Sequence, residues 1–141
     1  MSELLSTSVK SKMLRGASLL IYSKCIEQEY PGILREFSDG RVALGVCMEL
    51  LHMNMVGFKL LNIVKLSNVK ELEILTMDGS PHCIQLHFIG EHINRALGEP
   101  IPLTHYVIEK GKVFKVSTKV IKLARHLSEC AKLLGGDGEN A

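Results

Sequence analysis

The sequence predicts an α/β fold, a three-layer sandwich in which helices cover both faces of a mostly parallel sheet. Apolar segments of strand length alternate along the chain with segments of helical period, the pattern of strand–helix–strand units. Two later strand-like segments, 103–109 and 112–116, are joined by Lys110-Gly111, which is typical of a hairpin. We therefore expect an antiparallel C-terminal hairpin that supplies an edge strand of the sheet.

Three earlier segments have the composition of buried parallel strands, and helical segments separate them. The strands expected are 17–22, 41–46 and 70–76. The helices expected are 26–37, 49–66, 80–97 and a last one that Ser117 caps. Pro31 is expected to interrupt the first helix, because the residue before a proline avoids the helical region. A doubly wound strand order is the default for such a chain.

The length of 141 residues suits one α/β domain, which we place at 1–134. Residues 1–14 carry apolar side chains at roughly helical spacing and are a candidate N-terminal docking helix. Residues 135–141 are polar and glycine-rich, so we expect a disordered tail there.

Composition excludes several classes of function. The net charge is only +2, and the Lys and Arg residues are dispersed, so no nucleic-acid partner is expected. No stretch of about 20 apolar residues occurs, so no membrane span is expected. The first residues lack the apolar core of a secretory leader, which predicts a cytoplasmic protein with reduced thiols.

Familiar catalytic and nucleotide-binding motifs are missing. No G-x-G-x-x-G follows the first strand, and no G-x-x-x-x-G-K-[ST] or G-x-S-x-G occurs. Binding of dinucleotides in the usual way, ATP hydrolysis and esterase-like chemistry all lose support. The sequence therefore leaves open whether the protein is an enzyme.

Three of the four cysteines follow three different predicted strands. Parallel strands end at one edge of the sheet, so Cys25, Cys47 and Cys83 are expected along the same edge. Thiolates favour zinc, copper(I) and iron–sulfur clusters, so zinc or an iron–sulfur cluster is the candidate cofactor. A fourth ligand would be His82, His87 or His52. Packing of buried free cysteines by chance explains the pattern equally well.

The segment Asp78-Gly-Ser-Pro-His-Cys83 has the features of a helix start. Gly79 permits a tight turn, Ser80 is a good N-cap, and Pro81 suits the first helical position. Cys83 would then lie in the first helical turn, where the helix dipole favours a thiolate, and it is the candidate catalytic residue. The same turn, Gly79, Ser80, His82 and Cys83, is also a candidate anion-binding site.

These observations lead to two hypotheses. The first is a cysteine-lined site at the carboxyl edge of the sheet that binds a metal or iron–sulfur cluster, or uses a reactive thiolate in redox or sulfur chemistry. The alternative is a non-catalytic ligand-binding or assembly domain, a homo-oligomer or a subunit bound to a protein partner, with a small anionic ligand at residues 79–83.

Overall fold

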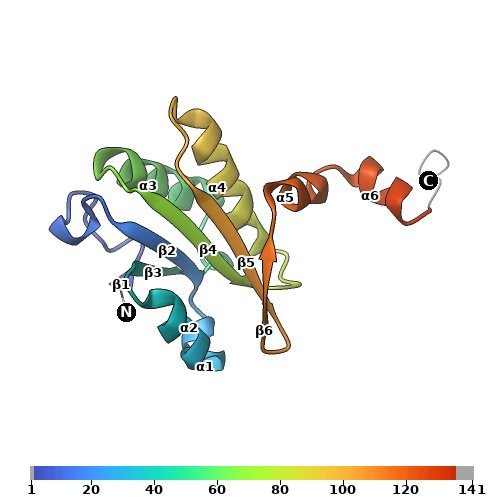
Figure 1. Cartoon of the computed structure of the whole chain (residues 1–141), viewed down its shortest axis with the longest axis horizontal. Helices are drawn as coiled ribbons and strands as arrows, with labels where there is room; N and C mark the ends of the chain where they lie inside the picture. The colour runs from blue at the N-terminus through green and yellow to red at the C-terminus, as the bar shows by residue number, and fades with distance from the viewer. Residues whose placement is uncertain (1, 136–141) are drawn as a thin grey trace.

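The computed structural model describes residues 2–135 and contains one six-stranded sheet in the order β1-β3-β2-β4-β5-β6 (Figure 1). The strands are β1 (Ser2–Glu3), β2 (Ser18–Ser23), β3 (Val42–Val46), β4 (Glu71–Met77), β5 (Leu103–Glu109) and β6 (Lys112–Val116). Neighbours from β1 to β5 pair in parallel, and β6 pairs antiparallel with β5. The predicted mostly parallel sheet with an antiparallel edge hairpin is confirmed.

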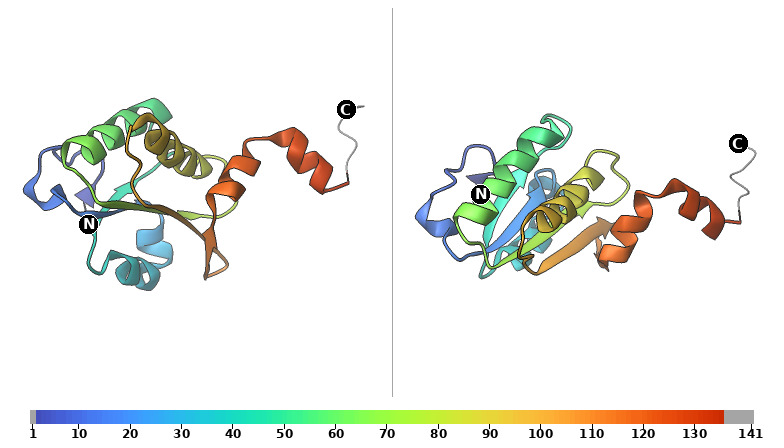
Figure 2. Two further views of the ribbon diagram at one scale, coloured as in Figure 1. Left: turned by 45° about the horizontal axis from the view of Figure 1, so that its top comes forward. Right: turned by 90° about the horizontal axis from the view of Figure 1, so that it is seen from above.

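Helices cover both faces of this sheet, as predicted. The short helices α1 (Ile26–Glu29) and α2 (Pro31–Ser38) lie on one face, and α3 (Met53–Leu66) and α4 (Ile84–Ala96) lie on the other (Figure 2). Pro31 starts α2, so the expected interruption is confirmed. None of the helices within residues 2–135 is both long and apolar enough to cross a bilayer.

Strand β2 is buried on both faces because helices cover both sides of the sheet. Its successive side chains point to opposite sides and so enter two different cores. Leu19 and Ile21 join the core beneath α3 and α4, while Leu20 and Tyr22 join the core beneath α1 and α2. The neighbouring strand makes room for the Tyr22 ring with Gly45, since a Cβ there would lie 2.9 Å from the ring carbon Cζ. The central strands therefore form a rigid base for the loops at their ends.

The sheet is doubly wound: β3 is added on one side of β2, and β4 is added on the other side. The order in which strands are added therefore reverses between β2 and β4, and we call this position the reversal point. From β2 the chain passes through α1 and α2 to β3 on one side, and then through α3 to β4 on the other side of β2. The loops that follow β2 and β4 consequently diverge at the carboxyl edge. Sheets of this kind bind ligands at that point of divergence.

Two expectations for the ends of the chain are wrong. Residues 2–14 do not form a docking helix; Ser2–Glu3 pairs with β3, and Lys12–Leu14 makes one 3₁₀ turn. The reason lies in the hydroxyl side chains, because Ser6 and Thr7 donate to the carbonyl oxygen of Glu3, an alternative to helical bonding.

The last helix is also split. Ser117 accepts a hydrogen bond from the backbone N–H of Val120, as expected of a cap, but α5 (Thr118–Ala124) ends before α6 (Leu127–Leu133) begins. Helix α5 lies beside the sheet, and α6 extends away from it (Figure 2). Of the expected tail 135–141, residues 136–141 lie outside the described residues.

Candidate functional site at the carboxyl edge of the sheet

A contact between Ser23 and Cys83 lies at the reversal point, between the ends of β2 and β4. Ser23 is the last residue of β2, and Cys83 ends the loop that follows β4. The hydroxyl of Ser23 donates a hydrogen bond to Sγ of Cys83 over 3.2 Å. The contact therefore joins the two loops that diverge at the reversal, and it gives a thiolate at Cys83 a neutral donor.

The loop before Cys83 has the predicted turn at Gly79, but the predicted helix start at Ser80 and Pro81 is wrong, because α4 begins at Ile84 and its N-cap residue is Cys83. Gly79 has a φ of 88°, a conformation that favours glycine. The Ser80 hydroxyl accepts a hydrogen bond from the N–H of Cys83 over 3.1 Å, and the Ser80 carbonyl accepts from the N–H of Ile84. The loop thus uses for itself N–H groups that an anion at residues 79–83 would need.

The thiol of Cys25, another of the strand-end cysteines, is partly buried and has negatively charged neighbours. Partial burial, followed by the negative charges of Cys83, Glu29 and Cys47, raises the pKa of the Cys25 thiol. Cys25 follows β2, Cys47 follows β3 and Cys83 follows β4, so the three cysteines come after the carboxyl ends of three parallel strands. All four cysteines are free, and Cys130 belongs to α6 instead.

The histidines proposed as a fourth metal ligand are directed elsewhere. His82 faces Glu49, with Nδ1 of the histidine 3.6 Å from the carboxylate, and His52 and His82 line a shallow pocket of about 310 Å³. His87 is buried and bonded to other side chains. Within residues 2–135, no three His, Cys, Asp or Glu side chains are grouped so as to hold a metal ion.

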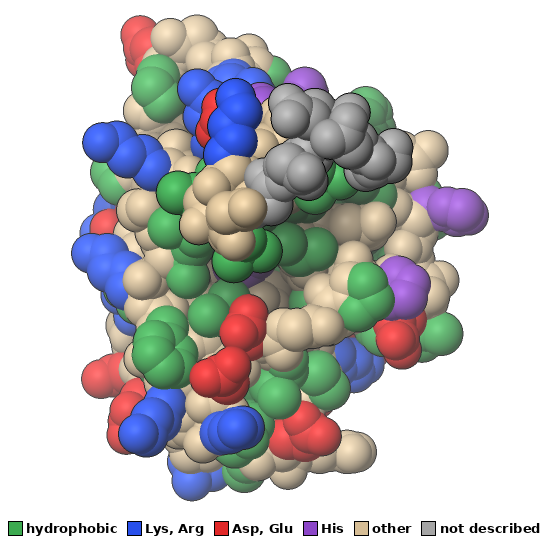
Figure 3. Space-filling model, turned by 90° about the vertical axis from the view of Figure 1, so that its right-hand side faces the viewer, with side chains coloured by type: hydrophobic (Ala, Val, Ile, Leu, Met, Phe, Trp, Pro, Cys, Tyr) green, Lys and Arg blue, Asp and Glu red, His purple; other side chains and the backbone are tan. Residues whose placement is uncertain are grey.

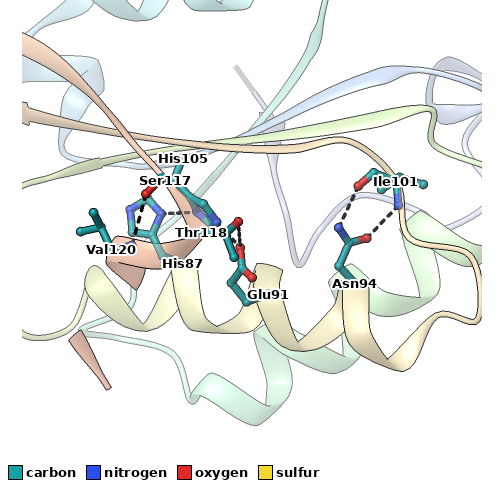
Figure 4. Close-up of polar contacts among 8 residues, drawn as sticks. All are labelled: His87, Glu91, Asn94, Ile101, His105, Ser117, Thr118 and Val120. Atoms are coloured by element: carbon teal, nitrogen blue, oxygen red, sulfur yellow. Dashed lines mark hydrogen bonds and ion pairs between the residues drawn. The ribbon is translucent and has the colours of Figure 1, made fainter. Parts of the chain in front are cut away.

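A buried polar chain runs from β4 through α4 to β5, and it is not among the sites expected from the sequence. Oγ1 of Thr76 lies 2.8 Å from Nε2 of His87, and Nδ1 of His87 lies 2.8 Å from Nδ1 of His105. Nε2 of His105 lies 2.7 Å from the Glu91 carboxylate, to which the Thr118 hydroxyl also donates (Figure 4).

The direction of each hydrogen bond in this chain follows from its carboxylate end. A carboxylate only accepts, so His105 donates from Nε2 to Glu91 and keeps a lone pair on Nδ1. His87 must then donate from Nδ1 to His105, and its bare Nε2 accepts from the Thr76 hydroxyl. Burial lowers the pKa of both histidines, that of His87 to about 3, which keeps both rings neutral.

A sequence signal for the polar chain does exist. His87 and Glu91 are one helical turn apart, and His87 falls on the apolar face of α4 together with Leu86, Ile89 and Ile93. Thr76 likewise interrupts a buried strand. Polar residues on a buried face need partners, but the partner His105 is supplied by another strand and is not identifiable from spacing.

The comparison with protein families agrees with this fold. A family described as "Rossmann-like domain" matches residues 11–136, which is most of the chain. The chain belongs to the Rossmann-like domain family. Neither a curated protein nor a solved structure matches it significantly.

As a Rossmann-like domain, the chain departs from the dinucleotide-binding pattern in the loop after β2. That loop reads Ser23-Lys24-Cys25 and contains no glycine, whereas the dinucleotide fingerprint requires glycines for close approach of a pyrophosphate. In place of glycines, the reversal point has the hydroxyl of Ser23 and the thiols of Cys25 and Cys83. Family membership thus describes the fold, and the residues at the edge must supply the argument for function.

Proposed function

We propose that this Rossmann-like domain is a thiol protein in which Cys83 is the reactive residue. The observation that carries the proposal is the hydrogen bond from the Ser23 hydroxyl to Sγ of Cys83 at the reversal point of the sheet. A donor at this position stabilises a thiolate, and Cys83 is also the N-cap residue of α4, where the helix dipole favours negative charge.

The chemistry that fits this arrangement is thiol–disulfide exchange with a small disulfide. The Cys83 thiolate attacks one sulfur of the disulfide, a mixed disulfide forms, and the other sulfur leaves as a thiolate. Cys25 is suited to remain a protonated thiol, because partial burial, and then the charges of Cys83 and Glu29, raise its pKa. A reducing cytoplasm would keep all these thiols available.

The test measures the release of coloured thiolate from an aromatic disulfide, dithiobis-nitrobenzoate, by the folded protein. Cys83→Ser is expected to remove the fastest phase, whereas Cys130→Ser, the same change in α6, is expected to leave it intact. A fast phase that survives Cys83→Ser would overturn the proposal.

A metal-bound form of the same site remains part of the proposal. Burial raises the pKa of the Cys25 thiol, and Cys83 and Cys47 add to the effect; a soft cation or an iron–sulfur cluster would instead favour its thiolate. Metal and sulfide analysis of protein purified without oxygen tests this form. Stoichiometric zinc or iron that the three Cys→Ser variants lose would support it, and metal-free protein would leave only the free-thiol form.

A second candidate function is assembly with another protein or with a second copy. Helix α6 buries none of its residues, and its Leu127 and Leu133 are 78% and 70% exposed. An apolar surface of this kind is typical of an interaction site. Light scattering across a wide concentration range tests for self-association, and a monomer throughout would remove the homo-oligomer.

A further inference from the structure

A second cavity lies beside the loop after β4, and one end of the buried polar chain, Thr76 and His87, forms part of its lining. It has a volume of about 420 Å³ and lies between the loop after β4, the hairpin strands and α5. Figure 3 views the molecule from this side and shows apolar side chains gathered around a hollow. The cavity shares Gly79 and Ser80 with the loop before Cys83, but none of its lining residues within 2–135 is a cysteine.

Most of the lining is apolar. The apolar lining residues include Ile84, Val107, Val116, Val120, Ile121 and Ala124. A volume of this size with few polar groups is typical of a pocket for a small molecule. The lining favours a ligand with a compact apolar body.

The two fully buried polar side chains that line the cavity hold no free hydrogen-bond donor. Thr76 and His87 line the cavity and expose about 1% of their surface each. The polar chain directs the Thr76 hydrogen toward His87, so Thr76 offers a lone pair to a ligand. Asp78 also lines the cavity, and its carboxylate accepts and repels anions.

We propose that this cavity binds a small apolar alcohol, whose hydroxyl donates to Oγ1 of Thr76. His87, His105 and Glu91 are positioning residues in this proposal. Their hydrogen bonds run in one direction from the cavity to the Glu91 carboxylate, and they hold the Thr76 hydroxyl in its accepting orientation.

The binding experiment compares three probes of similar apolar size: n-hexanol, its isomer methyl pentyl ether, and hexanoate. Methyl NMR of the full chain follows the resonances of Val107, Val116 and Val120. Hexanol is expected to bind about threefold to tenfold more tightly than the ether, the effect of one net hydrogen bond. Hexanoate is expected to bind most weakly, because of Asp78. Equal binding of alcohol and ether, tighter binding of hexanoate, or shifts confined to other residues would overturn the proposal.

Two variants and one matched control complete the binding test. Thr76→Val keeps the shape and removes the hydroxyl, so the preference for alcohol over ether should disappear. Val120→Phe, at a half-exposed position on α5, should fill the cavity and abolish binding of both probes. Val113→Phe is the same change on β6 away from the cavity and should leave binding unchanged. Binding that persists in Val120→Phe would place the probe elsewhere.

Nitrogen NMR of the histidine rings tests the positioning role directly. We expect His87 to carry its proton on Nδ1 and His105 to carry its proton on Nε2. The opposite tautomer of His87 would direct the Thr76 hydrogen into the cavity, and the preference would then be for an acceptor such as the ether. This readout does not depend on the stability of any variant.

Discussion

The Nδ1 atoms of His87 and His105 lie 2.8 Å apart, so one of these two buried rings donates its only proton to the other. The rings are tilted by 59° and are 4.9 Å apart at their centroids. A second proton on either ring would place a charge in the interior, and a second proton on His105 would also make two N–H donors face each other. The pair therefore requires both histidines to stay neutral.

This pair predicts that stability falls as the pH falls. Burial and the charge of His105 lower the pKa of His87 from 6.5 to about 3. Below about pH 6.5, His87 becomes protonated in the unfolded chain but stays neutral in the folded protein. Stability is therefore fully present above that pH and is lost progressively toward about pH 3, by about 1.4 kcal/mol per pH unit for one group. His105 adds in the same direction, since burial also lowers its pKa.

Urea unfolding between about pH 7 and about pH 4 measures this slope. The matched variant is His87→Gln, whose amide can donate and accept but does not titrate. Its stability should fall less steeply with decreasing pH than that of the parent protein. Parallel profiles would show that His87 does not titrate in the predicted window.

A methyl group at Gly90 in α4 is predicted to destabilise the fold, because the helix lies directly against the sheet there. A Cβ at Gly90 would lie 2.5 Å from Cδ1 of Ile74, a fully buried side chain. Gly90→Ala should lower the free energy of unfolding by about 1–3 kcal/mol, despite the better helix propensity of alanine.

Gly57 in α3 supplies the control for this experiment. Its surroundings are open enough that the nearest atom, Cγ2 of Ile89, would lie 3.8 Å from a new Cβ. Gly57→Ala should therefore stabilise by about 0.5–1 kcal/mol. Adding Ile74→Val, which removes Cδ1, should recover part of the loss in Gly90→Ala, and chemical denaturation checks the signs of all three changes.

Removal of one partner of the Arg41–Glu73 ion pair is predicted to lower the free energy of unfolding strongly. Nη2 of Arg41 lies 3.0 Å from the Glu73 carboxylate, and both side chains are largely buried. Arg41→Leu leaves that carboxylate without its partner and should destabilise by about 3–5 kcal/mol. The double variant Arg41→Leu/Glu73→Leu should be more stable than Arg41→Leu alone. A double-mutant cycle by urea unfolding measures the difference, and additive losses would argue against coupling.

Ser23 is predicted to control the reactivity of Cys83. Ser23→Ala removes the donor to Sγ, so the reaction of Cys83 with iodoacetamide should slow by about tenfold, near the lower limit for a hydrogen bond to a charged group. Ser67→Ala is the control, because its buried hydroxyl donates to the carbonyl of Val9, away from the edge cysteines. That variant should lose stability and keep the parent rate. An unchanged rate in Ser23→Ala would remove the donor from the proposed mechanism.

Local patterns accounted for much of the fold. The apolar runs, Pro31 at the start of α2, the turn at Gly79 and the Ser117 cap each depend on a few neighbouring residues, and each occurs as predicted. The N-terminal segment does not form the predicted helix. Hydrogen bonds from Ser6 and Thr7 to the carbonyl oxygen of Glu3 compete there with the helical bonds that the apolar spacing favours.

The α/β class, the edge hairpin and the position of three cysteines after strands can all be predicted from the sequence, since they follow from periodicity and from the rule that parallel strands end together. Which side chains meet at the carboxyl edge depends on the assembled sheet. The pairing of β2 with β4 brings Ser23 to Cys83, and the pairing of β4 with β5 brings His105 to His87. Such contacts depend on strand order and on register, because residues far apart in the chain become neighbours only when the sheet assembles.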